Sequence, residues 1–208
     1  MTGVQTCALP IFCTVDTVGT ATAVNPDGSI VVGEFLAIPQ VYVDESTGEE
    51  FHYCSDGAWR WSENGGTENL GDFTPDYRPL AQDLSDDGGV IVGVAFPYDF
   101  FLPRKSIIWT QATGFLDFQE FLESQGTFAP GWAFQVAGTI SGDARTVGGF
   151  GASAFGYQGF TVQMPKVVVC HAPQGNPSNK KSLDVKFPED LGTHLAHGDT
   201  IGLCGSGL

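Results

Sequence analysis

The residues of this chain whose types could do chemistry gather near its C-terminal end, where cysteine and histidine recur at short intervals. Cys170 and His171 are adjacent, and the segment HLAHGDTIGLC holds His194, His197 and Cys204. Three of the four histidines of the chain lie in this part. Thiols and imidazoles at such spacing are compatible with a disulfide-closed loop or with a metal site.

A disulfide between Cys170 and Cys204 would close a loop of about 35 residues and stabilise the folded state by roughly 3–4 kcal/mol in the chain-entropy model. A module of only about forty residues needs such a covalent link, because its apolar core is small. The imidazoles would then act as capping or hydrogen-bonding groups, with Asp199 as their partner. A cysteine–histidine nucleophile pair is the weakest interpretation of the same residues.

The metal alternative uses Cys170, His194, His197 and Cys204 as two sulfur and two nitrogen ligands of a tetrahedral Zn²⁺, with His171 as a further candidate ligand. The His-x-x-His spacing can place both imidazoles on one side of a helical turn.

Without Cys7, which lies in the segment 1–11, four of the five cysteines remain, and they allow three connectivities. Cys13 and Cys54 either pair with each other or stay as free buried thiols, or Cys13 has a partner upstream that is missing.

The composition indicates the kind of fold that must position these residues. The chain has 208 residues with 28 glycines, 12% aromatic residues and only 9 lysines and arginines. Many glycines and aromatics with few helix formers are typical of an all-β protein with many turns.

Charge divides the chain near Met164–Lys166. Residues 1–165 hold 5 basic and 20 acidic side chains, whereas residues 166–208 hold 4 of each, for a net charge of −15. An acidic body disfavours nucleic acid and anionic membrane as partners, because phosphate binding requires a positive field. No apolar run is long enough to span a bilayer.

One pattern occurs three times, as ATAVNPDGSIVVGEF, AQDLSDDGGVIVGVAF and VAGTISGDARTVGGFG, at spacings of 60 and 56 residues. Each copy contains a tight-turn signal, in which Asn or Ser bonds its own backbone. In the first two copies Gly at the fourth position accepts a positive φ, and the third copy is a variant with Ala144 there. Turn chemistry accounts for the acidic residues there without calcium. The turn residues are Asn25, Asp27, Gly28, Ser85, Asp87, Gly88, Ser141 and Asp143.

Short apolar runs follow the turns, at Ile30–Val32, Val90–Val92 and Thr146–Val147. Consecutive apolar positions predict strands that are covered on both faces. A second hairpin follows in each copy, so the pattern predicts four strands per unit, about three units and a partial β-propeller. We expect a short helix that Asp117 caps and Gly126 ends. We expect the acidic insert at 38–57 to be a solvated loop.

The phrases VNPDGSIVVG, AWRWSENGGTENLG, LSDDGGVIVG and IIWTQATGFLDF resemble the HAF repeats of bacterial extracellular and autotransporter proteins. This resemblance assigns residues 12–165 to HAF-type repeats, which are thought to be β-propeller blades without an assigned activity. Three blades are too few to close a ring, so we expect upstream blades to be missing. Residues 1–11 resemble a translated sequencing adapter, and a signal peptide would have been lost with the true N-terminus.

Residues 166–208 resemble a small C-terminal module of secreted bacterial proteins with the pattern C-H-x-P-x-G-N-P…H-L-x-H-G-D-x-x-G-x-C. The extracellular setting that this resemblance implies favours the disulfide over zinc. We therefore expect a non-catalytic secreted or cell-surface protein that binds an extracellular ligand or surface without a cofactor. The alternatives are an enzyme with its active site in missing blades, and a C-terminal module for zinc binding or sorting.

Overall fold

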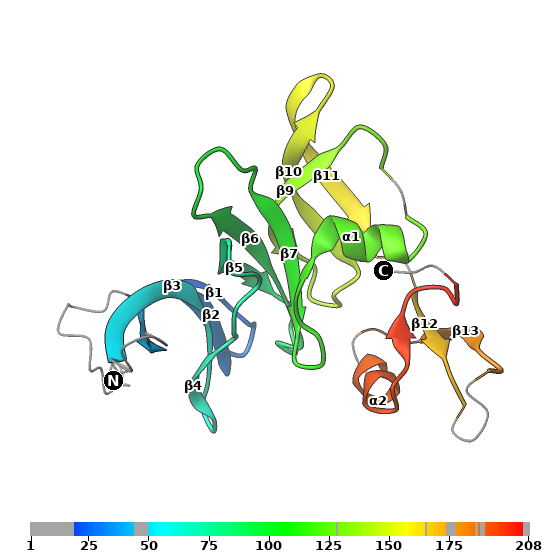
Figure 1. Cartoon of the computed structure of the whole chain (residues 1–208), viewed down its shortest axis with the longest axis horizontal. Coiled ribbons are helices and arrows are strands. Elements are labelled where there is room, and N and C mark those ends of the chain that lie inside the picture. The colour runs from blue at the N-terminus through cyan, green and yellow to red at the C-terminus, as the bar shows by residue number, and fades with distance from the viewer. Residues whose placement is uncertain are drawn as a thin grey trace.

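The computed structural model describes residues 19–43, 50–127, 129–164, 166–173, 178–185, 187 and 190–205, with only the backbone for 36–43 and 50–56. The described chain is mostly β and forms four antiparallel sheets (Figure 1). The predicted all-β class is therefore confirmed. The segment 1–11 and Cys13 lie outside the described residues, and so does the side chain of Cys54.

The first and second sheets are four-stranded meanders in chain order, and the third sheet has three strands in the order β11-β10-β9. The strands of the first sheet are β1 (Gly19–Val24), β2 (Ile30–Val43), β3 (Glu50–Ser62) and β4 (Gly66–Asn69). Those of the second are β5 (Tyr77–Leu84), β6 (Val90–Pro97), β7 (Lys105–Thr110) and β8 (Gly114–Asp117). Those of the third are β9 (Ala133–Ile140), β10 (Thr146–Ser153) and β11 (Gly156–Gln163).

The C-terminal module forms a separate small sheet in the order β13-β12-β14, with one short helix. Its elements are β12 (Val167–His171), β13 (Lys181–Val185), α2 (Leu191–Ala196) and β14 (Thr200–Ile201). The prediction of four strands in each repeat is wrong for the third unit, because β12, the next strand along the chain, pairs with β13 and β14 instead of β11.

The three repeat turns are built alike, as their sequence predicts. In each turn the first side chain, on Asn25, Ser85 or Ser141, accepts a hydrogen bond from the backbone N–H five residues later, at 2.9–3.0 Å. The carboxylate of the third turn residue, Asp27, Asp87 or Asp143, accepts a hydrogen bond from the backbone N–H two residues later. The acidic turn residues therefore act as local hydrogen-bond acceptors.

The turns also bond to one another along the chain. The Asn25 Nδ2 donates to the carbonyl of Asp86 at 3.1 Å, and the Asp86 N–H donates to the carbonyl of Gly142 at 2.9 Å. Gly28 and Gly88 have positive φ at the fourth turn position, and Ala144 has a φ of 58° at the equivalent position. Each unit is thereby held in a fixed register to the next.

The second sheet lies at the centre of the core. One face of it, with Ile91 and Trp109, packs on Val32 and Ala58 of the first sheet. The other face packs on the third sheet and on α1 (Phe118–Ser124). The predicted helix is confirmed, since Asp117 caps it by accepting from the N–H groups of the two residues at its second and third positions.

The prediction that strands of every unit are covered on both faces is right for the second sheet alone among the described residues. All but the last two residues of β6 are buried. In the first sheet, Val31 and Trp61 are only half-buried, and Val24 is exposed. The end units of a stack have a neighbour on one side only, and among the described residues no other unit covers this face of the first sheet.

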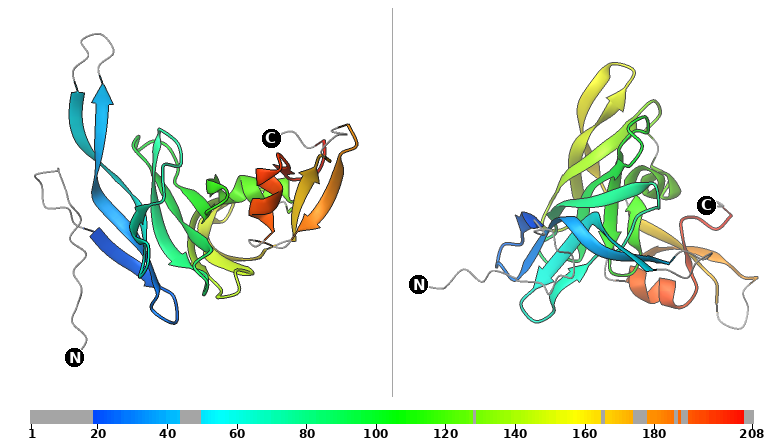
Figure 2. Two further views of the ribbon diagram at one scale, coloured as in Figure 1. Left: turned by 90° about the horizontal axis from the view of Figure 1, so that it is seen from below. Right: turned by 60° about the vertical axis from the view of Figure 1, so that its left-hand side comes forward.

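The prediction of a solvated loop at 38–57 is wrong. Strands β2 and β3 continue their antiparallel pairing to Val43 and Glu50, and the ribbon extends well beyond the rest of the first sheet (Figure 2, left). The tip at 44–49 lies outside the described residues. Neither helix of the described chain has the length and apolar composition needed to cross a lipid bilayer.

Candidate functional site

The C-terminal module brings His171, His194 and Asp199 together. Strands β12 and β14 pair with Cys170 opposite Thr200, which places the next residue of β12, His171, beside the residue before β14, Asp199. His194 comes from α2. The chain turns back after this helix at Gly198, whose φ is 86°, and the Asp199 N–H donates to the His194 carbonyl at 3.1 Å.

The Asp199 carboxylate receives three hydrogen-bond donors. Its Oδ2 lies 2.8 Å from the Nδ1 of His171 and 2.7 Å from the Nδ1 of His194. Its Oδ1 accepts from the Ala172 N–H at 3.0 Å. The two imidazole rings meet edge to face, with centroids 5.8 Å apart. One carboxylate thus links the end of β12, the helix α2 and the start of β14.

Burial and hydrogen bonding act in opposite directions on this carboxylate. The Asp199 side chain has no exposed surface, which alone would raise its pKa. The hydrogen bonds from His171, His194 and the Ala172 N–H outweigh burial and lower the pKa to about 2. An ionised carboxylate can only accept, so each Nδ1 carries a proton in this arrangement.

The disulfide alternative for the cysteines is the one that the structure contains. Cys170 and Cys204 are bonded, with their Cα atoms 4.7 Å apart and a sequence separation of 34. Their sulfurs are therefore engaged with each other and are not free thiolates for the predicted zinc set. His197 is exposed at the C-cap of α2, whereas the neighbouring His194 takes part in the Asp199 cluster.

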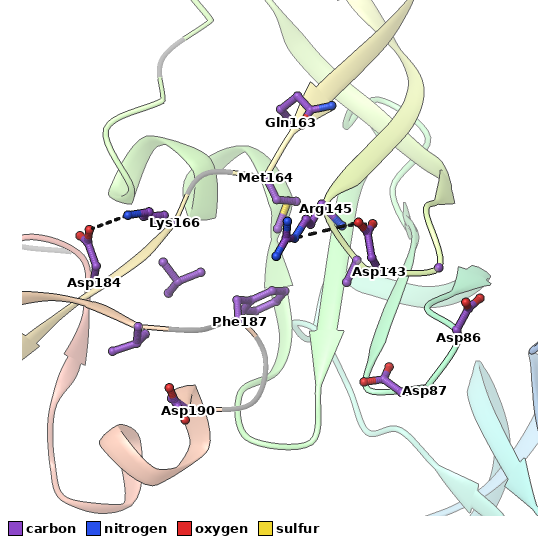
Figure 3. Close-up of a pocket in the computed structure, with 14 residues that line it drawn as sticks. Asp86, Asp87, Asp143, Arg145, Gln163, Met164, Lys166, Asp184, Phe187 and Asp190 are labelled. Atoms are coloured by element: carbon purple, nitrogen blue, oxygen red, sulfur yellow. Dashed lines mark hydrogen bonds and ion pairs between the residues drawn. The ribbon is translucent and has the colours of Figure 1, made fainter.

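A cleft of about 1050 Å³ lies between the repeat turns and the C-terminal module (Figure 3). Asp86, Asp87 and Asp143 line it from the turns, and Asp184 and Asp190 line it from the module. Two cationic side chains partly balance these charges. The Nζ of Lys166 lies 3.6 Å from the Oδ2 of Asp184, and the Nε of Arg145 lies 4.0 Å from the Oδ2 of Asp143. No Ser, Thr, Cys, His or Tyr is among the described residues that line the cleft. The lining therefore offers no hydroxyl or thiol nucleophile with a histidine base.

Sequence reasoning missed a set of exposed aromatic side chains. Phe100 and Phe101, in the β6–β7 connection, are 98% and 96% exposed, and Phe155 and Tyr157, at the β10–β11 turn, are 89% and 75% exposed. Both connections join the second strand of a sheet to the third, and both lie at the upper edge of Figure 1. The density of aromatics in FPYDFFLP was the available signal.

The fold and sites define an all-β protein of stacked antiparallel units with a disulfide-closed C-terminal module. Comparison with known proteins finds no family model that matches the chain, no curated protein similar to it and no solved structure similar to it.

Proposed function

We propose that the chain is part of a secreted or cell-surface β-propeller that binds a neutral polysaccharide through its exposed aromatic connections and catalyses no reaction. The observation that carries this proposal is the near-complete exposure of Phe100, Phe101, Phe155 and Tyr157 on two equivalent connections. Large aromatic side chains are usually buried, and several of them exposed on equivalent connections are typical of an interaction surface.

The chemistry of this surface favours a carbohydrate partner. Aromatic rings provide flat, rigid apolar area of the kind that can stack on the C–H face of a sugar ring, and a phenol adds a hydrogen-bonding group. Asp99, in the same connection as Phe100, and Gln158, beside Tyr157, are polar neighbours in sequence. A net charge of −15 disfavours anionic polymers, so the polysaccharide is neutral.

The open face of the first sheet supports the propeller. Val31 and Trp61 pair across β2 and β3 at the same register as Ile91 and Trp109 across β6 and β7. In the second sheet this face is covered by the preceding unit, and the Trp109 Nε1–H donates to the Leu70 carbonyl of that unit at 3.2 Å. The equivalent face of the first sheet fits a further unit of the same kind.

A second observation on the same face agrees with this placement. The ring of Trp59 lies over Gly33 and packs 5.8 Å from the ring of Phe35, centroid to centroid. Its Nε1–H is buried and has no hydrogen-bond partner among the described residues. A buried N–H without an acceptor is uncommon, and the backbone of a neighbouring unit would supply one.

Retention on insoluble cellulose, chitin and starch tests the binding proposal. We expect the protein to be retained by at least one of them. The double variants Phe100→Ser with Phe101→Ser, and Phe155→Ser with Tyr157→Ser, should each weaken retention about tenfold or more, since a stacked ring contributes about 1 kcal/mol.

Leu102→Ser is the matched control, because Leu102 is an aliphatic residue in the same connection as Phe100 and is 42% exposed. It should leave retention close to that of the parent protein. Retention by no polysaccharide, or equal retention of the Ser variants, would refute the proposed partner.

A further inference from the structure

We propose that His171, His194 and Asp199 form a binding site for a divalent transition-metal ion, with zinc favoured by the ligand types. One potential ligand atom from each residue lies within 4.8 Å of the other two. This set differs from the predicted zinc set, because a carboxylate replaces both sulfurs and His197 is absent. The site is independent of the aromatic connections and of the proposed polysaccharide binding.

The ligand chemistry fits zinc. Two imidazole nitrogens and one carboxylate oxygen are a known zinc ligand combination, which leaves a fourth tetrahedral position for water or another molecule. In such a site neighbouring ligand atoms are about 3.3 Å apart, given metal–ligand distances near 2.0 Å. The present Nδ1–Oδ2 distances are 2.8 and 2.7 Å. A movement of about 0.5 Å would open the cluster around an ion.

The hydrogen bonds of the cluster show where the cation would go. Two Nδ1–H groups converge on a single oxygen, Oδ2 of Asp199, so two protons now occupy the space between the three ligand atoms. If the proton on each Nδ1 moves to Nε2, both Nδ1 atoms become free to bind the ion. The net charge of the rings does not change in that step.

Burial and access are also suitable for an ion. The Asp199 side chain is fully buried and carries the negative charge, while the His171 and His194 side chains are 29% and 23% exposed. The ion can therefore approach from the imidazole side. The Cys170–Cys204 disulfide, next to His171 in sequence, holds β12 to the C-terminal segment, so little chain entropy is lost on binding.

The test measures zinc binding by the full oxidised chain through competition with a chromophoric chelator, together with the visible absorption of the cobalt-substituted protein. We expect one ion per chain and cobalt bands of tetrahedral intensity. His171→Gln and His194→Gln should each weaken zinc affinity at least about tenfold, since even the loss of an outer hydrogen-bond partner of a ligand costs 10–100-fold.

His197→Gln is the matched control, because His197 is exposed and lies three residues from His194. It should leave zinc affinity unchanged. Near-UV circular dichroism and the mass of the intact disulfide establish that each variant is folded, and Asp199→Asn provides an independent change of the third ligand.

Two results would overturn the proposal. The first is an absence of zinc binding by the folded parent chain at 100-fold excess of the metal. The second is a loss of zinc affinity in the His197→Gln variant equal to that in His171→Gln, or no loss of zinc affinity in the folded His171→Gln variant. Either pattern would assign the binding to other residues.

Discussion

The repeat sheets and the C-terminal module are stabilised in different ways. The central sheet is covered on both faces by other apolar side chains, so the stability of each repeat depends on its neighbours. The module has short strands and few buried apolar residues. It relies on the Cys170–Cys204 disulfide and on a buried carboxylate, Asp199, with three donors. The module therefore adds a covalent link and a buried polar cluster to the core that its Val167, Val169 and Leu191 share with the second and third sheets.

The largest expected effect concerns the stability that a repeat gains from the unit packed against it. It is measured by replacing the same residue type, tryptophan, at two equivalent positions of neighbouring sheets. Trp109→Ala should lower the free energy of unfolding by about 3–5 kcal/mol, because Trp109 is only 4% exposed and packs between two sheets. Trp61→Ala should cost under about 1.5 kcal/mol in this chain, since its face is open. Urea unfolding, followed by circular dichroism, measures the free energy of unfolding of both variants. Equal losses of stability in the two variants would show that a covering unit does not stabilise Trp109 more than Trp61.

The next effect concerns the module. Replacing both Cys170 and Cys204 by Ser should destabilise the module by roughly 3–4 kcal/mol through the entropy of the opened loop. Amide hydrogen exchange should accelerate in β12 and β13 and stay unchanged in β6 and β7. An equal acceleration in β6 would show that the module and the repeats unfold as one unit.

The smallest effect tests the turn chemistry through pH. Burial tends to raise the pKa of Asp87, but hydrogen bonds from the Ser85 hydroxyl and the Gly89 N–H outweigh it and hold the pKa below 3.8. A lowered folded-state pKa stabilises the protein above pH 3.8, and this contribution is lost as pH falls through the folded value.

Asp87→Asn should therefore lower stability by under about 1 kcal/mol at pH 6, a small value because the carboxylate is largely exposed. The difference from the parent protein should shrink at acidic pH, as measured by urea midpoints. A difference that stays constant down to pH 2.5 would mean that the charge of Asp87 is not involved.

The features that the sequence predicted correctly depend on local chemistry. The turn at Asn25 and the helix cap at Asp117 are formed by side chains that bond to the backbone within a few residues. The Cys170–Cys204 disulfide, and Asp199 as partner of the imidazoles, follow from the few polar and thiol groups that a small module can bring together.

The features that it did not predict depend on distant partners. The pairing of β2 with β3 through most of the acidic insert is decided across strands. The local signal, VYV and FHY on either side of a polar turn with a glycine, was outweighed by the many acidic residues there. The separation of His194 from His197 depends on where α2 ends, at Ala196. The exposure of Phe100 could not be distinguished by residue type from the burial of Phe118.

The backbone of Asp86 has a consequence for how such a gene can change by insertion and deletion. Its carbonyl accepts from the turn before it and its N–H donates to the turn after it. An added or lost codon in any of these turns would break a hydrogen bond between units, so a change in turn length would weaken the contact between them. The connections at the other end of the units, β6–β7 and β10–β11, already differ in length from each other. This makes them natural places to graft foreign peptides.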